Sequence, residues 1–439
     1  MAGVTAACPE MMGESDDEPR GAPAEWQAGL DPYAPPRADA TASAVGVGAL
    51  AWVLTTYFAE GLPYSLVHQV IAQQYFTDAG LSYAALGLTA LLHAPWNAKF
   101  LWAPLIDRWG NAKRWLIGAQ LALAGALLAA SVLASAWAVQ PMILLLVGMA
   151  FMAATNDIAI DTYYMRALAK PQQARFTGAR VMAYRAALVA GNGGLVVLAG
   201  VAGWSVALGV GAVALLASAT LHRIYLAPDP PGEARGLPLR ETVVSFFQRP
   251  GIALALAFIV LFKAGDALMF AMNAPLLREL GLQTAERGFY YGTLGTGASV
   301  AGSILGGVLA ARGLERWLTP VAVVQSLAIL LYAALAALRP SLPVIASVIV
   351  VEQLVAGVGS SVFVVFILRL CDGPHKATHF SFGTAIMSLA VTGAGTVSGF
   401  LLQRIGFTGF FLLAFAASLP GVLLAPLVSR DRGGPRQLA

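Results

Sequence analysis

The sequence predicts an all-α protein whose helices cross a lipid bilayer many times, and three observations lead to this prediction. The 439 residues are 58% hydrophobic and 11% charged, whereas about a quarter of the residues of a soluble domain are charged. Apolar stretches of bilayer-spanning length recur along most of the chain, and basic residues gather in every second connection between them. A soluble fold is excluded, because the chain has too few charges to cover its apolar surface.

A helix needs roughly 20 apolar residues to cross the hydrocarbon core of a bilayer. We predict about twelve such spans, at residues 45–66, 82–103, 115–137, 141–165, 178–201, 204–226, 251–275, 287–312, 317–338, 343–370, 376–402 and 406–429. The stretch GASVAGSILGG at 297–307 places small residues at the spacing of a helix–helix contact.

The distribution of Lys and Arg predicts the orientation, because loops that stay in the cytoplasm retain basic residues. The short connections on one side contain Arg108, Lys113, Arg114, Arg166, Lys170, Arg175, Arg180, Arg312, Arg316, Arg369 and Lys376. Those on the other side contain only Arg278, Arg287, Arg339 and Arg404. Both termini are therefore predicted to lie in the cytoplasm.

Proline and charge divide the chain into five predicted parts. Residues 1–44 combine many prolines with an excess of acidic residues, which is typical of a disordered tail. Residues 45–226 form an N-terminal six-helix half, 227–250 a central cytoplasmic loop, 251–429 a C-terminal six-helix half, and 430–439 a cytoplasmic tail. The two halves have weak sequence similarity to each other, for example between NAKRWLIGAQ in the first and GLERWLTPVAVVQ in the second. A parallel repeat of two six-helix halves is the architecture of major facilitators, which bind substrate between the halves.

The segment KFLWAPLIDRWGNAKRW, at the inner end of the second span, combines an acid, a helix-breaking glycine and basic residues in one turn. These residues are Asp107, Arg108, Gly110, Lys113 and Arg114. They resemble the D-R-x-G-x-x-R loop of major facilitators, which latches the inner gate. The alternative is a positive-inside anchor, although an anchor has no need of an aspartate.

Three acidic residues lie deep inside predicted spans, where a charge costs about 2.5–3.5 kcal/mol on insertion scales. Glu60 and Asp266 lie at similar depth in the equivalent first and seventh spans, and Glu352 lies inside the tenth. All three are candidates for proton coupling or for the substrate cavity. Lys263 precedes Asp266 by three residues, so the two either belong to that site or neutralise each other as a buried ion pair.

The stretch FMAATNDIAIDTYYMR places Asp157 and Asp161 four residues apart, and therefore on one face of a helix. Arg180 and Arg185 lie at similar depth in the next span. Two acids facing two arginines indicate a gating network near the cytoplasmic side. Direct proton handling by the two aspartates is the alternative.

His68 and His93 are the histidines of the first two spans, and a histidine can titrate near neutral pH. His68 is therefore a further candidate for proton coupling. For both histidines, a hydrogen-bonded contact between helices is the alternative.

No motif in the chain predicts catalysis, because the zinc-protease, phosphate-loop and nucleophile-elbow patterns are absent from the sequence. The two cysteines, Cys8 and Cys371, imply neither a disulfide framework nor a metal cluster. We therefore expect no enzyme activity, no metal and no cofactor. The expected partners are a small-molecule substrate, protons and the lipid bilayer, without nucleic acid, and we expect a monomer.

Five segments, found in order between residues near 50 and near 425, together resemble the AmpG-type branch of the major facilitators. They are AEGLPYSL, KFLWAPLIDR, TNDIAIDTYYM, LFKAGDALM and VEQLVAGVGSSVFVVFILRLCDGPHKATHFSFGTAI. The branch includes muropeptide permeases, importers of siderophores and the acetyl-CoA transporter group. The resemblance covers the positions Glu60, Gly61, Pro63, Lys99, Pro104, Asp107, Arg108, Asp157, Asp161, Gly265, Asp266 and Glu352. It implies a proton-driven importer in the bacterial inner membrane.

The predicted function is therefore secondary active transport, as proton-coupled import of a sizeable polar solute such as a muropeptide or a peptidoglycan fragment. DTYYMRAL and KATHFSFGTA look closer to uncharacterised members of the branch than to the muropeptide permeases. A siderophore permease of the same branch is one alternative. A membrane sensor or scaffold that has a transporter fold and does not transport is the other.

Overall fold

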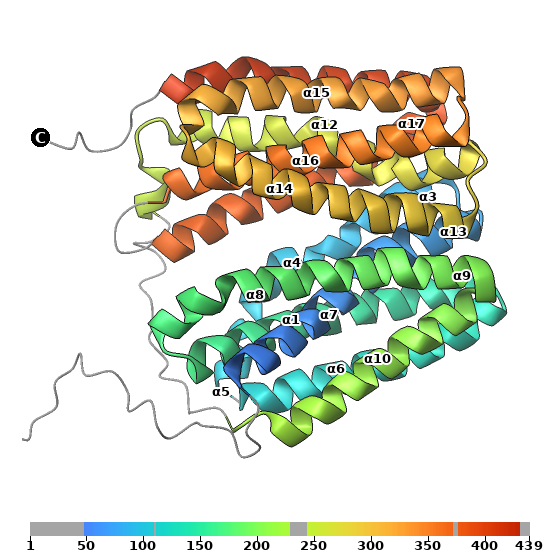
Figure 1. Ribbon diagram of the computed structural model, residues 1–439, viewed down its shortest axis with the longest axis vertical. Coiled ribbons are helices and arrows are strands. Elements are labelled where there is room, and N and C mark those ends of the chain that lie inside the picture. Colours follow the sequence, from blue (N-terminus) through green and yellow to red (C-terminus); the bar gives the residue numbers. More distant parts are fainter. Residues whose placement is uncertain (1–47, 109–110, 229–243, 372–375, 431–439) are drawn as a thin grey trace, which may run out of the picture. The chain divides into compact units, whose positions relative to one another are not determined.

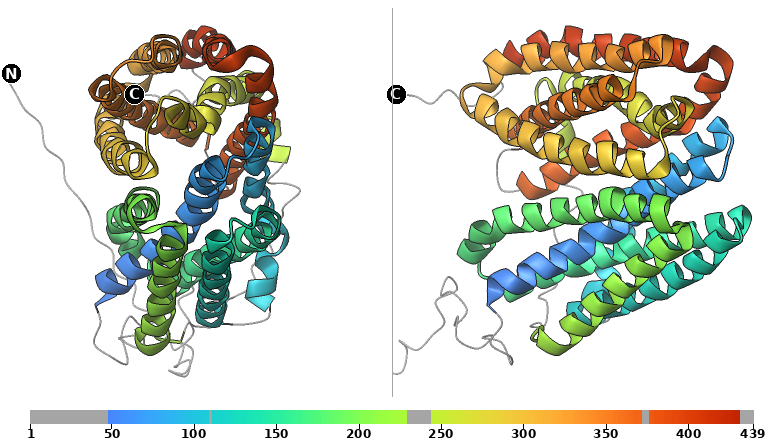
Figure 2. Two further views of the ribbon diagram at one scale, coloured as in Figure 1. Left: turned by 90° about the vertical axis from the view of Figure 1, so that its right-hand side faces the viewer. Right: turned by 45° about the vertical axis from the view of Figure 1, so that its right-hand side comes forward.

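The computed structural model of the protein describes residues 48–108, 111–228, 244–371 and 376–430. Every regular element in these ranges is a helix, and the helices form two groups (Figures 1 and 2). The first group precedes residue 227 and the second follows residue 243. The predicted acidic tail, most of the predicted central loop and residues 431–439 lie outside the described residues.

The helices of the first group follow one another in the order of the sequence. They are α1 (Ala49–Ser65), the π-helical η1 (Leu66–Tyr75), α2 (Phe76–Asp78), α3 (Tyr83–Leu88), η2 (Thr89–His93), α4 (Ala94–Ala98), η3 (Lys99–Leu101), α5 (Ala103–Arg108), α6 (Ala112–Ser135), α7 (Val139–Ala167), α8 (Lys170–Leu188), η4 (Val189–Leu195), α9 (Val196–Ala202) and α10 (Trp204–Tyr225). The second group is α12 (Ile252–Glu279), α13 (Thr284–Arg287), η5 (Gly288–Gly295), α14 (Thr296–Ala311), α15 (Leu314–Leu338), α16 (Leu342–Arg369) and α17 (Lys376–Arg430).

Nine helical stretches of the described chain are long and apolar enough to cross a membrane. Eight of them correspond to one predicted span each, and the ninth, Phe382–Ser429, covers the last two. Within this last stretch the backbone leaves the helical conformation at Gly406, with φ 68° and ψ 172°. Glycine adopts this positive φ readily, and the bend falls where the two predicted spans meet.

The first two predicted spans differ most from the structure, and neither is among the nine stretches. The predicted span 45–66 ends too early, because α1 continues as a helix through η1 and α2 to Asp78. The polar residues of η1 interrupt the apolar pattern, yet His68, Gln69 and Gln73 line a cavity between the groups. The predicted span 82–103 is divided into the short helices α3 to α5.

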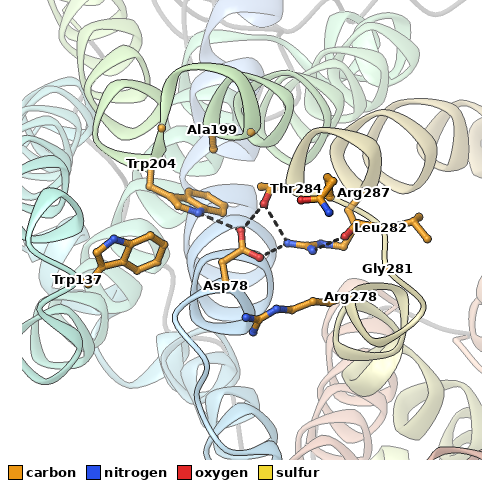
Figure 3. Close-up of a pocket in the computed structure, with 12 residues that line it drawn as sticks. Asp78, Trp137, Ala199, Trp204, Arg278, Gly281, Leu282, Thr284 and Arg287 are labelled. Atoms are coloured by element: carbon orange, nitrogen blue, oxygen red, sulfur yellow. Dashed lines mark hydrogen bonds and ion pairs between the residues drawn. The ribbon is translucent and has the colours of Figure 1, made fainter.

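Glycines allow backbones to approach closely both between and within the two groups. Gly292 of η5 lies against the carbonyl of Asn192 in η4, where a Cβ atom would overlap it. Gly302 of α14 lies in the same way against the carbonyl of Leu354 in α16, which confirms the helix contact predicted for 297–307. The groups also meet at the end of α2, where Asp78 and Arg287 form an ion pair (Figure 3).

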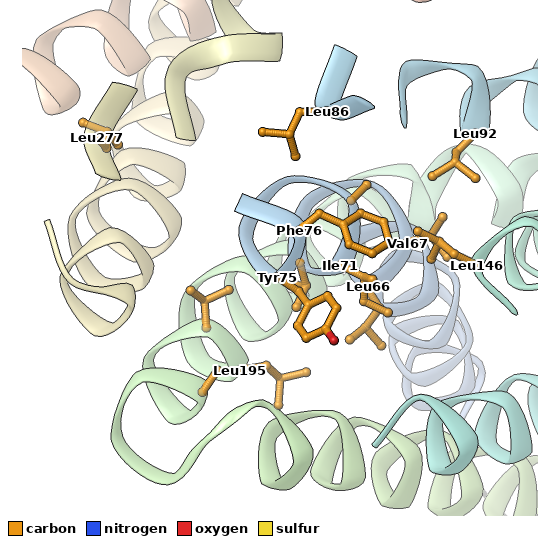
Figure 4. Packing of buried hydrophobic residues seen from close by; sticks show 14 of the residues in the cluster. Leu66, Val67, Ile71, Tyr75, Phe76, Leu86, Leu92, Leu146, Leu195 and Leu277 are labelled. Carbon is orange, nitrogen blue, oxygen red and sulfur yellow. The ribbon is translucent and has the colours of Figure 1, made fainter. Parts of the chain in front are cut away.

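The helical run through η1 lies at the centre of the largest apolar cluster. Leu66 and Ile71 are fully buried, and Leu195 of η4 and Leu277 of α12 belong to the same cluster (Figure 4). Because α12 belongs to the second group, both groups share this core. The shared core fixes the position of η1, which also carries side chains of the cavity.

Candidate functional site

A cavity of about 440 Å³ lies between the two groups and is lined by both. The first group contributes Tyr64 and the polar side chains of His68, Gln69, Gln73, Thr89 and His93. The second group contributes Lys263, Asp266, Tyr291, Gln353 and several apolar residues. Small-molecule sites are commonly about 300–1,000 Å³ and combine an apolar lining with a few polar groups. The cavity therefore has the size and lining of a solute site.

The first group also contains a cluster of charged residues, whose member Glu60 lies one helical turn along α1 from the cavity-lining Tyr64. The Lys99 ammonium of η3 forms an ion pair with the Asp157 carboxylate of α7. Arg180 of α8 forms a second pair with Asp161, with 3.0 Å between Nη2 and Oδ1. Tyr57 donates its hydroxyl to the same Oδ1 at 2.8 Å. Each aspartate predicted to share a helix face thus has its own cationic partner.

The sequence prediction for these aspartates is corrected in one respect. Arg180 pairs with Asp161 as expected, but Arg185 is half-buried and forms no ion pair with either aspartate in the described part of the chain. Lys99 takes the predicted place of Arg185. The reason is that the second span is divided into short segments, and η3 brings Lys99 beside α7.

Glu60 is the third acidic residue of this cluster, and it forms no ion pair with a cation among the described residues. Its carboxyl group interacts through space with the charges of Asp157, Asp161, Arg180 and Lys99. The residue is 8% exposed, and its Oε2 atom has no hydrogen-bond partner among the described residues. Three carboxyl groups therefore share two cations. Tyr64, which lines the cavity, lies one helical turn beyond Glu60.

In the second group, Asp266 is neutralised on its own helix. Lys263 Nζ lies 3.2 Å from Asp266 Oδ2, and the amide of Gln325 donates to the same oxygen. The Lys263 ammonium also lies 5.4 Å from the ring centroids of Phe262 and Phe363. The ion pair that the spacing allowed is therefore present, and both of its members line the cavity.

Glu352 of α16 differs from Asp266 because its hydrogen-bond partners among the described residues are neutral. Tyr332 donates to Glu352 Oε2 at 3.3 Å and Gln353 donates to it at 3.0 Å. The residue is 1% exposed, and no ion pair joins it to a described cation. Among the described residues, each group of helices thus holds a buried carboxyl that forms no salt bridge, Glu60 in the first and Glu352 in the second.

His68 and His93 stack on each other beside the cavity. Their ring centroids are 3.8 Å apart with 21° between the planes, and both rings line the cavity. His93 Nδ1 lies 3.2 Å from the carbonyl oxygen of Ala90. The structure therefore brings together two histidines that the sequence placed in separate spans.

The predicted gating turn is described only in part. Asp107 and Arg108 are the last residues of α5, but their side chains and all of Gly110 lie outside the described residues. Lys113 donates to the carbonyl of Leu226, and Arg114 is exposed.

A polar cluster at the end of α2 joins the two groups, and the sequence analysis did not find it. Asp78 forms an ion pair with Arg287 and accepts hydrogen bonds from Thr284 at 2.6 Å and Trp204 at 3.1 Å (Figure 3). Arg287 is 1% exposed and donates from Nε to Gln74 at 3.0 Å. One feature of the sequence could have indicated this cluster: Arg287 is a basic residue on the side of the membrane where basic residues are predicted to be few.

Comparisons with known proteins agree with this architecture. Residues 49–362 match the family model of the Major Facilitator Superfamily. The anhydromuropeptide permease of Escherichia coli K12 is 30% identical over 387 residues, which cover 84% of this chain and 77% of the permease. An uncharacterised protein of Haemophilus influenzae is 26% identical over 402 residues, or 85% of this chain and 93% of that protein.

Several solved structures have the same fold as this chain, although their sequence identity to it is low. A bacterial homologue of the human lysosomal transporter Spinster, in an inward-facing and unoccupied conformation, has a TM-score of 0.66 and 18% identity. The alignment covers 87% of this chain and 96% of that one. A D-xylose–proton symporter has a TM-score of 0.67 and 10% identity, with 86% and 97% covered.

Proposed function

The chain belongs to the Major Facilitator Superfamily, as a membrane transporter of its AmpG-like branch, and we propose that it imports an anhydromuropeptide together with protons. The main observation in support of proton coupling is that the charged cluster of the first group, one helical turn along α1 from the cavity-lining Tyr64, has more acids than cations. Asp157 and Asp161 form ion pairs with Lys99 and Arg180, whereas Glu60 forms none with a cation in the described part of the chain. Glu60 is thus the acid of the cluster that can gain a proton without breaking a salt bridge.

The physical basis is the cost of an uncompensated buried charge. An ionised carboxylate in an apolar site lacks the solvation of water, so burial disfavours its charged form. Where the cavity opens to water, the same group can release its proton. A carboxyl that alternates between the two conditions can carry one proton for each cycle of the transporter.

The contacts between the groups support alternating access. Asp78, Thr284 and Arg287 hold the groups together at the end of α2. With the orientation that the loop charges predict, this end faces away from the cytoplasm. The contact would then close the outer side, and the cavity would exchange solute with the cytoplasmic side.

The substrate class rests on the named relative and on the lining of the cavity. The E. coli protein is named an anhydromuropeptide permease, and anhydromuropeptides combine a saccharide with a peptide. Aromatic and amide side chains from both groups, together with the Lys263–Asp266 pair, offer contacts for both parts. In this proposal the protein works as a monomer in the bacterial inner membrane, with both termini in the cytoplasm.

Uptake by proteoliposomes tests the proposal. Purified protein should accumulate a labelled anhydromuropeptide when the outer medium is made acidic, and a protonophore should abolish the accumulation. Adding the solute without an imposed gradient should drive protons inward, which an internal pH dye records. A carrier that equilibrates the solute without moving protons would contradict the coupling. A protein that moves neither would support the sensor or scaffold alternative.

A further inference from the structure

The proposed proton coupling gives no role to the two stacked histidines, His68 and His93, at the cavity wall. His68 lies in η1 and is 4% exposed, and its two ring nitrogens have no hydrogen-bond partner among the described residues. A neutral imidazole has one donor and one acceptor nitrogen. Buried polar atoms are nearly always hydrogen-bonded, and this ring lines the cavity. The unpartnered nitrogens therefore belong to a ring that forms part of the cavity wall.

A contact with the backbone determines the tautomer of His93. Its Nδ1 atom lies 3.2 Å from the carbonyl oxygen of Ala90, and a carbonyl can only accept. Nδ1 therefore carries the proton, and Nε2 of the neutral ring is an acceptor. This leaves His93 suited to a hydroxyl or N–H donor of the solute.

Aromatic rings surround the histidine pair on its other sides. Tyr64 lies 4.7 Å and Trp96 4.8 Å from the His68 ring, measured between centroids. Such a frame keeps the imidazoles flat against each other and limits their rotation. Because two stacked imidazolium rings would repel each other, the arrangement favours neutral rings that act through hydrogen bonds.

The two walls of the cavity differ in charge. The wall of the first group presents the histidines with Gln69 and Gln73, all without formal charge when the rings are neutral, whereas the second group presents the Lys263–Asp266 pair. Hydroxyl groups match the first wall, because amides and imidazoles exchange hydrogen bonds with them and ring faces cover their apolar C–H surfaces. Carboxylate and ammonium groups match the second wall.

We propose that His68 and His93 bind the saccharide part of the solute and determine specificity for it, while Lys263 and Asp266 bind its ionised peptide part. This assignment rests on the proposed function, because it takes the cavity as the solute site. It fixes the orientation of the solute, with its sugar toward the first group of helices and its peptide toward the second.

Binding of the separated parts tests the assignment with the full-length protein in lipid nanodiscs. The probes are the peptide-free disaccharide and the sugar-free peptide of one anhydromuropeptide, each measured by calorimetry. His68→Phe and His93→Phe keep a flat ring and remove the nitrogens. Each should weaken disaccharide binding about tenfold or more, the value of roughly one good hydrogen bond, and leave peptide binding within about twofold.

The matched control is the double variant Lys263→Gln/Asp266→Asn, which removes both charges and keeps similar size. It should weaken the peptide and spare the disaccharide. His68→Gln retains a donor and an acceptor and should recover part of the disaccharide affinity. Equal losses for both probes in the histidine variants, or no loss for either, would overturn the assignment.

The binding experiment and the uptake experiment fail in distinguishable ways. If the wild-type protein accumulates the whole solute with protons but does not bind the disaccharide, the proposed function stands and the histidine assignment is wrong. If the disaccharide binds in a histidine-dependent manner and no proton moves, the assignment stands and the coupling is wrong. If neither probe binds and nothing is transported, both are wrong.

Discussion

Lys99 and Arg180 each neutralise one aspartate of α7, and this pairing gives Glu60 a different role from its neighbours. Protonating Asp157 or Asp161 would break an ion pair and leave a cation without its partner. Protonating Glu60 removes a negative charge that forms no salt bridge with a described cation. The distinction depends on which cation contacts which acid, and the residue types alone do not reveal it.

We predict that Glu60→Gln separates binding from coupling. The amide resembles the protonated carboxyl in shape, so the variant should still bind solute and exchange labelled for unlabelled solute across the membrane. Accumulation driven by a pH gradient should fall to passive equilibration. Proteoliposome uptake measures both quantities in the same preparation.

Asp266→Asn is the comparison for this variant, because Lys263 holds Asp266 in an ion pair. It should lower solute affinity and leave the ratio of protons to solute unchanged. Accumulation by Glu60→Gln as strong as in the parent protein would move the coupling to another acid. Glu352, which also has no salt bridge, would be the next to test.

The sequence could predict part of this site for physical reasons. A spacing of four residues is enough to place Asp157 and Asp161 on one face, and three residues are enough to pair Lys263 with Asp266. The partner of Asp157 could not be predicted, because Lys99 comes from a segment whose division into short helices depends on packing against α7.

At the scale of single helices, close backbone contact at small residues positions several of the helices. Lipid tails are as apolar as leucine, so helix contacts in a membrane rely on small residues and packing. The contact between α14 and α16 follows this rule, because Gly302 meets the carbonyl of Leu354 and Gly357 meets that of Ser299. Small-residue spacing was readable from the sequence, whereas the partner helix was not.

We predict that Gly302→Ala destabilises the protein and Gly297→Ala does not. The added methyl group at 302 overlaps the backbone of α16, and overpacking typically costs about 1–3 kcal/mol. Gly297 is in the same helix with nothing within 4 Å of its Cβ position, and alanine favours a helix by about 1 kcal/mol over glycine. Thermal unfolding in detergent should therefore show a lower Tm for the first variant only. Equal melting temperatures would show that α16 can move aside.

The first helical run shows why hydropathy alone misplaced an element. His68, Gln69, Gln73 and Gln74 interrupt its apolar pattern, and a count of apolar residues stops before them. In the structure these side chains face the cavity or Arg287, so they do not meet lipid. A helix that lines a solute path need not be apolar on every side.

For the whole molecule, the cluster around Asp78 and Arg287 determines how firmly the two groups close at the end of α2. The two residues lie 209 positions apart in the sequence, and only the packed fold brings them together. Breaking a buried ion pair by removing one partner typically costs about 3–5 kcal/mol. The conformational equilibrium between the two open states should respond to this loss.

We predict that Arg287→Gln opens this end of the transporter. The reporter is a cysteine at Gln73, which lines the cavity, in a protein whose Cys8 and Cys371 are replaced by serine. The rate of its labelling by a membrane-impermeant reagent from outside should rise about tenfold or more, as expected for a shift of a few kcal/mol. Size-exclusion chromatography checks that the variant remains folded.

Arg339→Gln is the matched control, because Arg339 forms an ion pair with Glu279 at 2.8 Å but the two side chains are 61% and 41% exposed. Exposed pairs contribute little, so labelling should stay at the parental rate. A similar rise in both variants would indicate a general loss of basic charge and would exclude a specific gate at Arg287.

The two neutral pairs Lys99–Asp157 and Arg180–Asp161 also have an electrical consequence. With them neutral, the cluster carries one negative charge when Glu60 is ionised and none when Glu60 is protonated. A membrane voltage of 100 mV acts on one elementary charge with about 2.3 kcal/mol. An interior-negative voltage should therefore hasten the return of the empty, deprotonated carrier. In proteoliposomes, a potassium diffusion potential should raise the rate of net uptake and leave solute exchange, which needs no empty return, unchanged.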